Sequence, residues 1–199
     1  MRVVPAAVVS LLIACSASAE PRVLPQVRDG DVVLQTSRSG QSQAIQLATD
    51  SPWSHVGLIE VTPEGIFVIE AIGKVSRTPW ATWKKRGVGE KVTILRPKGL
   101  APVQVAKVLA EARRFLGKPY DAKFGWSDAR IYCSELVYKA YQRGAGVKAG
   151  AMQKVRELDL NGIEQQVMER YGQIPWDLEL VTPASVAEAE IFEELYSDF

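Results

Sequence analysis

The order of strand-like and helix-like patterns along the chain most strongly limits what it can fold into. Short apolar runs bounded by turn signals come mostly before residue 100, and patterns with helical spacing come mostly after it. Strands are expected at about 31–35, 54–61, 66–72 and 91–96, and helices at about 42–49, 102–116, 133–143 and 162–170, the last capped by Asn161. This segregation predicts a fold of the α+β class.

Length and charge limit the class of protein further. The chain has 199 residues, of which 47% are hydrophobic and 24% charged, enough for one globular domain with a real core. Its 24 Lys and Arg residues against 23 Asp and Glu residues leave a formal net charge of +1. No overall field therefore favours nucleic acid or an anionic membrane as a partner.

The first 19 residues have the features of an export signal. Arg2 precedes an apolar stretch from Val3 to Ile13, and Ala17 to Ala19 form a small-residue cleavage site. The apolar stretch is too short for a stable membrane-spanning helix, which disfavours an uncleaved signal anchor. Residues 20–199 are then expected to form a single catalytic domain in the periplasm.

Cys15 suggests a second processing route. The residues before it, Leu12 to Ala14, resemble the end of a bacterial lipoprotein signal, which would be removed as 1–14 and leave Cys15 acylated. The mature domain would then be tethered to the outer membrane by its lipidated end, and the sequence leaves both routes open.

Either route leaves Cys133 as the only thiol of the mature domain, so a disulfide within it is excluded. An unpaired cysteine in an oxidising compartment is either buried and inert or kept for its reactivity. The run RIYCSELVYKAY places Cys133 in the first turn of the helix predicted over 133–143, with Gly144 as its stop. Free backbone N–H groups and the helix dipole stabilise a thiolate there, which favours a nucleophile.

A cysteine nucleophile needs a base, and the chain has one histidine, His55, at the start of a predicted strand. A purely structural histidine is the alternative. One histidine without a Cys, Asp and Glu cluster at ligand spacing does not build a zinc hydrolase site, so neither metal nor other cofactor is expected.

Glu70 interrupts the apolar strand IFVIEAI. It either accepts a hydrogen bond from the imidazole of His55 or points to the solvent face. A regular hairpin closed at 63–65 would place Glu70 opposite about Ile59, roughly 13 Å along the strand from His55. Twist, a bulge or a longer loop would have to close this gap.

Two tryptophans and one polar loop are further candidates for the site. Trp53 and Trp126 suggest apolar walls of a pocket, although core packing is the alternative. The loop Ser39 to Ser42 lacks the lysine and the glycine spacing of a phosphate loop.

Three segments resemble the YiiX and YaeF group of circularly permuted, papain-like, NlpC-type amidases: GDVVLQTSRSGQSQAIQLATDSPWSHVG, FVIEAIG and GKPYDAKFGWSDARIYCSELVYKAY. His55 precedes Cys133, which is the order of the permuted branch. The resemblance implies an antiparallel sheet packed against helices, with the cysteine at a helix N-terminus. It spans from about Asp29 to at least Tyr171, and the last segment, 183–199, matches nothing in it.

The resemblance also implies roles for individual residues. Cys133 would be the nucleophile, His55 the general base and Glu70 the third polar member. Tyr120, which precedes the cysteine loop, would donate to the oxyanion or shape the cleft, with core packing as its alternative.

The expected function is that of an exported cysteine hydrolase or amidase. It would act through a thioester on an amide-linked cell-envelope substrate, either a cell-wall peptide or an N-acyl conjugate. One alternative is a lipid acyl hydrolase or acyltransferase with the same Cys-His site, and another is a non-catalytic envelope ligand-binding module. A membrane is expected as a partner only through the N-terminal lipid, and nucleic acid not at all.

Overall fold

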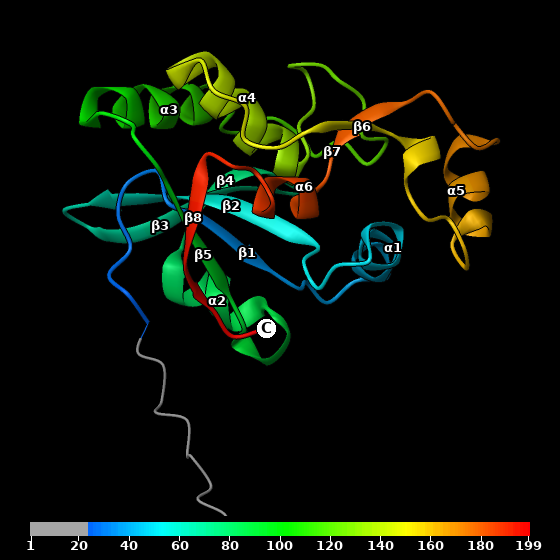
Figure 1. Cartoon of the computed structure of the whole chain (residues 1–199), viewed down its shortest axis with the longest axis horizontal. Helices are drawn as coiled ribbons and strands as arrows, with labels where there is room; N and C mark the ends of the chain where they lie inside the picture. The colour runs from blue at the N-terminus through cyan, green and yellow to red at the C-terminus, as the bar shows by residue number, and fades with distance from the viewer. Residues whose placement is uncertain (1–23) are drawn as a thin grey trace, which may run out of the picture.

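The computed structural model describes residues 24–199, so the expected export signal, its lipoprotein alternative and Cys15 lie outside the described residues. A six-stranded antiparallel sheet with the order β4-β3-β2-β1-β5-β8 forms the centre of the molecule (Figure 1). Its strands are β1 (Val32–Gln35), β2 (His55–Thr62), β3 (Gly65–Ile72), β4 (Lys74–Pro79), β5 (Thr93–Pro97) and β8 (Phe192–Ser197).

Helices cover both faces of this sheet. The helices α3 (Pro102–Arg114) and α4 (Cys133–Ala145) lie on one face, where Val56 and Leu58 of β2 join their core cluster. The short helix α2 (Trp80–Arg86) lies on the other face, where Ile59 packs in the cluster of Trp83. Because successive side chains of a strand alternate between two buried faces, the central strands read as continuous apolar runs.

A smaller unit lies beside the sheet at the right of Figure 1. It contains α1 (Gly40–Thr49), α5 (Glu164–Tyr171) and the antiparallel pair of β6 (Met152–Lys154) and β7 (Glu179–Val181). We call this unit the α1–α5 lobe. Its own core cluster is built on Tyr132, Val155, Leu160, Ile163 and Leu180, with side chains of α1 packed against it.

The predicted α+β class is confirmed. The C-terminal end of α4 differs from its prediction because of a contact between two helices. Helix α4 continues through Gly144 to Ala145 and ends at Gly146, which has a φ of 73°. A Cβ atom on Gly144 would lie 2.5 Å from the backbone nitrogen of Val108 in α3. Gly144 is therefore not the predicted stop; it lets α3 and α4 approach closely.

The helix predicted over 162–170 is observed as α5, which begins after Ile163, without the expected Asn161 cap. Several connecting elements were not predicted. The connecting pieces are the 3-10 turns η1 (Val88–Glu90) and η2 (Val155–Glu157) and the short helix α6 (Pro183–Ala187). The C-terminal segment that matched nothing supplies α6 and the edge strand β8, which pairs with β5. Across residues 24–199, every helix is too short or too polar to cross a bilayer.

Candidate active site

Cys133 is the first residue of α4 and is almost completely buried, with 3% of its surface exposed. The carboxylate of Glu135 accepts a hydrogen bond from the backbone N–H of Tyr132 and so closes the first turn of the helix. The sulfur of Cys133 accepts hydrogen bonds from the backbone N–H groups of Val56 and Ser134. The predicted position of the thiol at a helix N-terminus is therefore observed, against the beginning of β2.

His55 and Glu70 are in direct contact, with 2.5 Å between His55 Nε2 and Glu70 Oε2. The hairpin has a two-residue loop, because Thr62 pairs with Gly65, and Ile59 pairs with Val68 rather than with Glu70. Continuing this register places Glu70 opposite Gly57, diagonal to His55 on the same face of the sheet. The expected register was wrong, and the tighter turn removes the gap without a bulge.

Gly57 keeps the space between these two side chains open. A Cβ atom there would lie 2.4 Å from Val68 Cγ1 and 3.4 Å from Glu70 Cβ. A larger residue would push β3 side chains away from the histidine. A glycine is therefore required at position 57 for steric reasons.

Glu70 is fully buried, so the solvent-face alternative is wrong. Thr78 Oγ1 donates to its Oε1 at 2.5 Å, and Arg86 Nη2 donates to its Oε2 beside His55. Burial raises the pKa of Glu70, but the hydrogen bond and charge of His55, followed by Thr78 and Arg86, lower that pKa to about 2. Glu70 is consequently a carboxylate at neutral pH.

Cys133 and His55 form a coupled pair. Burial lowers the pKa of His55, but hydrogen bonds and charge from Cys133 and Glu70 outweigh it and raise the pKa to about 9. Burial raises the pKa of the Cys133 thiol, yet the hydrogen bond and charge of His55 and the two backbone N–H groups bring it below its ordinary value. Since Nε2 faces Glu70, the other ring nitrogen is left for the thiol, and the mutual shifts of the two pKa values favour a thiolate beside an imidazolium.

Tyr120 lies beside this pair. Its backbone N–H donates to the carbonyl of Gly73 at 2.8 Å, and its hydroxyl accepts a hydrogen bond from Gln41 Nε2 at 2.7 Å. Burial, and then the negative charge of Cys133, raise the pKa of Tyr120 and keep the phenol protonated. The hydroxyl proton is therefore available to a ligand. Tyr120, His55 and Gln41 line one polar cleft.

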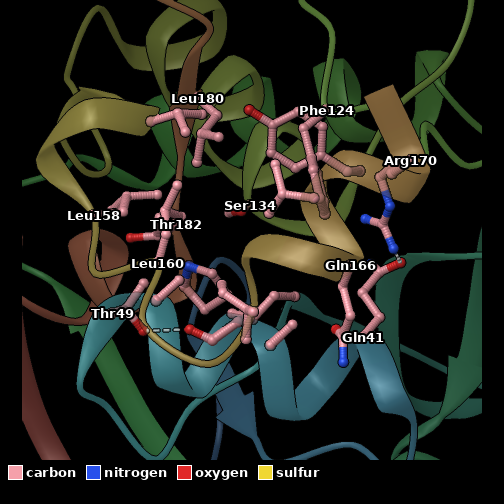
Figure 2. Close-up of a pocket in the computed structure, with 18 of the residues that line it drawn as sticks. Gln41, Thr49, Phe124, Ser134, Leu158, Leu160, Gln166, Arg170, Leu180 and Thr182 are labelled. Atoms are coloured by element: carbon pink, nitrogen blue, oxygen red, sulfur yellow. Dashed lines mark hydrogen bonds between the residues drawn. The ribbon is translucent and has the colours of Figure 1, made fainter. Parts of the chain in front are cut away.

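An apolar pocket opens on the other side of the thiol, between α1 and α5 (Figure 2). Cys133 and Ser134 line it, together with Ala44, Ile45, Ala48, Phe124, Leu158, Leu160, Ile163, Val167 and Leu180. Gln41 borders both the pocket and the cleft. Cys133 thus lines the apolar pocket, and its partner His55 lines the polar cleft.

The two tryptophans expected as pocket walls lie elsewhere. Trp53 Nε1 donates to Thr93 Oγ1 at 2.9 Å, and Trp126 packs edge-on against Tyr138 with 5.5 Å between ring centroids. Neither residue lines the apolar pocket.

Four residues around the site were missed from the sequence: Thr78, Trp83, Arg86 and Gln41. Trp83 is fully buried and lies 6.2 Å from the His55 ring between centroids. Its neighbours Thr78 and Arg86 come from β4 and α2, whose short mixed patterns carry no signal for a carboxylate partner. Only the buried charge of Glu70 demanded that such partners exist.

A histidine strand that precedes a cysteine helix, with both side chains meeting at the end of an inner strand of an antiparallel sheet, is the arrangement of a circularly permuted papain-like protein. The family model described as permuted papain-like amidase enzyme, YaeF/YiiX, C92 family, matches residues 26–196, and the chain belongs to this family. Family membership places it among the hydrolases of the amidase class. It also confirms the resemblance found in the sequence.

Two relatives support the assignment. The chain is 42% identical over 168 residues to the uncharacterized protein YiiX of Escherichia coli strain K12, covering 82% of this chain and 83% of the relative. It is similar to a crystal structure described as metalloprotein yiiX from Escherichia coli O157:H7, with a TM-score of 0.83 and 40% identity, covering 86% of this chain and 98% of the other.

That crystal structure is described as a metalloprotein. Among residues 24–199, no group of three or more His, Cys, Asp and Glu side chains is placed to hold a metal ion. Both oxygens of Glu70 are already bound by His55, Thr78 and Arg86. The donor set of residues 24–199 therefore does not fit a resident metal.

Proposed function

We propose that this chain is an exported cysteine amidase that cleaves an amide-linked cell-envelope substrate through a thioester. Cys133 is the nucleophile, His55 the base and then the acid, and Glu70 orients the imidazole. The observation that carries this proposal is the buried line of hydrogen bonds from Cys133 through His55 to Glu70. It is the arrangement that activates a nucleophile and fixes the tautomer of its base.

The reaction follows from this arrangement. The thiolate of Cys133 attacks the amide carbonyl, a sulfur–carbon bond forms, and negative charge moves to the carbonyl oxygen. The carbon–nitrogen bond then breaks while the imidazolium of His55 gives its proton to the departing amine. Water, deprotonated by His55, attacks the thioester, the carbon–sulfur bond breaks, and the carboxylic acid is released while the thiolate and imidazolium pair is restored.

Two kinds of donor are available for the oxyanion. The backbone N–H of Ser134, in the first turn of α4, lies beside the Cys133 sulfur, where the carbonyl oxygen of a bound substrate would develop its charge, and the protonated hydroxyl of Tyr120 lies beside the thiol. Because Gln41 donates to the Tyr120 oxygen, the hydroxyl hydrogen is free to turn toward the substrate. We assign Tyr120 this role in preference to core packing.

The apolar pocket favours an N-acyl conjugate over a cell-wall peptide. Leu158, Leu160 and Leu180 give it a wall that suits an alkyl chain and offers few partners to a polar peptide. The same wall suits an acyl ester, so a lipid acyl hydrolase or acyltransferase is the second candidate. A ligand-binding module would use the pocket without the thiol.

We also propose a periplasmic location. The Arg2 to Ala19 pattern supports secretion, with a free mature chain after Ala19 or an outer-membrane anchor at Cys15. Comparing the N-terminal mass of the native chain with that of Cys15→Ser distinguishes the two routes. Recovery of an unprocessed cytosolic chain would contradict both.

Intact-mass trapping tests the function. The purified protein is incubated separately with an N-decanoyl amide, a decanoyl ester and a cell-wall peptide. We expect a decanoyl adduct from the amide that is absent in Cys133→Ala and still present in Cys15→Ser, the matched cysteine control. An adduct from the ester alone would support the lipid hydrolase, and one from the peptide alone would redirect the substrate. Ligand binding without any adduct would support the binding module.

A further inference from the structure

The apolar pocket has two unlike ends. Figure 2 shows Leu158, Leu160 and Leu180 toward one end and Gln41, Gln166 and Arg170 toward the other. Ser134, which follows Cys133 directly in the chain, is labelled between them. A substrate that reacts at the thiol therefore has an aliphatic surface on one side and a cation on the other.

Arg170 is half-buried, and it forms no ion pair with a carboxylate of residues 24–199. Its Nη2 donates to Gln41 Oε1 at a long 3.4 Å, and its guanidinium lies 5.5 Å from the centre of the Phe124 ring. Arg143, by comparison, holds Asp128 through two hydrogen bonds of 2.7 and 2.9 Å. The guanidinium of Arg170 has unused donors in the planar arrangement that matches a carboxylate.

The contacts of Arg170 lead from the apolar pocket, which it lines, to the polar cleft of His55. Arg170 contacts Gln41, Gln41 donates to Tyr120 at 2.7 Å, and both Gln41 and Tyr120 line the polar cleft of His55. In the proposed reaction His55 delivers a proton to the departing amine. A negative charge bound at Arg170 therefore belongs to the amine portion of the substrate, a short distance from the scissile bond.

We infer that Arg170, aided by Gln41, binds a carboxylate on the amine portion, so that the substrates are N-acyl amino acids. This inference rests on the proposed amidase function and adds its substrate class. The acyl chain lies against Leu158 and Leu180, and the α-carboxylate, one carbon from the amide nitrogen, meets Arg170. Hydrolysis yields a fatty acid and a free amino acid. Arg170 is a binding residue that takes no part in bond making or breaking.

A carboxylate suits this position better than a phosphate headgroup. The chain of contacts from Arg170 to Tyr120 contains only the one side chain of Gln41, so the anion must lie close to the amide. A phosphate on an ethanolamine linker lies further from the nitrogen. A phosphoethanolamine conjugate is therefore included as a separate substrate in the test.

The test compares kcat/KM for N-decanoylglycine, its neutral N-decanoylglycinamide and N-decanoyl-phosphoethanolamine, using the full chain. We expect the wild type to prefer the carboxylate over the neutral amide by about tenfold to a hundredfold, the usual value of a charged hydrogen-bonded pair. Arg170→Gln should bring that ratio close to one, mainly through KM, and Arg170→Lys should restore part of it. Arg114→Gln, an exposed arginine on α3, is the matched control and should keep the ratio.

The possible results separate the two proposals. A wild type that cleaves both amides equally, or an Arg170→Gln variant that slows both equally, would overturn the role of Arg170 while the amidase stands. A preference for the phosphoethanolamine conjugate would overturn the amino acid class. No cleavage and no Cys133 adduct with any of the three amides would contradict the proposed function itself.

Discussion

The residues on the two sides of Cys133 differ in how far they are buried and hydrogen-bonded. On the sheet side, Glu70 is completely buried and its two oxygens receive hydrogen bonds from three side chains, each on a different element. On the lobe side, α5 contributes no fully buried side chain and α1 contributes only Ser42. The catalytic side chains are therefore positioned by a dense network of buried hydrogen bonds. The wall of the apolar pocket is formed by two helices with few fully buried side chains.

This difference indicates that one region serves catalysis and the other serves substrate binding. A residue with several buried hydrogen bonds has one geometry, which suits proton transfer. Helices with few buried contacts open locally at low cost, which suits entry of a ligand of variable length. Changes on the sheet side should therefore appear in kcat and in the pH profile, and changes in the α1–α5 lobe should appear in KM and substrate choice.

Removal of the charge on Glu70 should have the largest effect. We expect Glu70→Gln to lower kcat by about 10² to 10⁴, which is a smaller loss of kcat than that of Cys133→Ala. The loss is smaller because misorienting the base impairs the reaction less than removing the nucleophile does. The same change should raise the pH midpoint of Cys133 alkylation, since the imidazolium loses its counter-charge. Turnover and iodoacetamide labelling against pH are the measurements.

Glu60 is a matched control for this change. It is 1% exposed on the neighbouring strand and is paired with Arg77 and Arg113, away from the thiol. Glu60→Gln should lower the thermal midpoint of unfolding but keep the alkylation profile. If both variants shift that profile alike, the special role of Glu70 is lost.

Filling the apolar pocket should have the next largest effect. Ala44 of α1 lines the pocket, and Ala44→Phe should occupy space needed by about three methylenes of an acyl chain. At about 0.8 kcal/mol for each buried methylene, kcat/KM for a decanoyl substrate should fall by about fiftyfold. A butanoyl substrate should be affected much less, and labelling by iodoacetamide should not change.

Ala110, exposed on α3, provides the control for this variant. Ala110→Phe should leave the chain-length preference as it is. An equal loss for the short and long substrates of Ala44→Phe would mean that the α1–α5 lobe does not bind the acyl chain.

The pH profile should show the smallest effect. Alkylation of Cys133 should have a midpoint below the ordinary thiol value of about 8.5, because its pKa is lowered chiefly by His55. Turnover should fall about tenfold per unit above pH 9, where His55, with a pKa raised to about 9, loses the proton that it gives to the amine. A midpoint at or above 8.5 would contradict an activated thiol.

Stability should depend on pH in a defined way. The folded pKa of His55 is raised from 6.5 to about 9, so its contribution is fully present below pH 6.5 and is lost as the pH rises through 9. The folded pKa of Glu70 is lowered from 4.5 to about 2, so its contribution is present above pH 4.5 and is lost as the pH falls through 2. The midpoints of thermal unfolding of the wild type and of Glu70→Gln should differ most between pH 4.5 and 6.5, where both contributions are fully present.

The sequence by itself determined the elements with strong local patterns. The apolar runs of β2 and β3, the helical spacing of α3 and α4, and the helix start at Cys133 depend on neighbours within a few residues, so they could be predicted. The pairing of Cys133 with His55 followed from elimination, since His55 is the only histidine and Cys133 is the only cysteine outside the expected export signal.

Only the tertiary structure decided how these parts meet. A one- or two-residue change in the loop at 63–65 moves Glu70 along β2 by as many positions, and no local signal distinguishes these registers. The apolar pocket joins α1 to residues that follow it by more than 100 positions, and Arg170 reaches Gln41 across 129. Such contacts depend on how complete elements pack against one another, whereas the sequence pattern records only whether each side chain is to be buried.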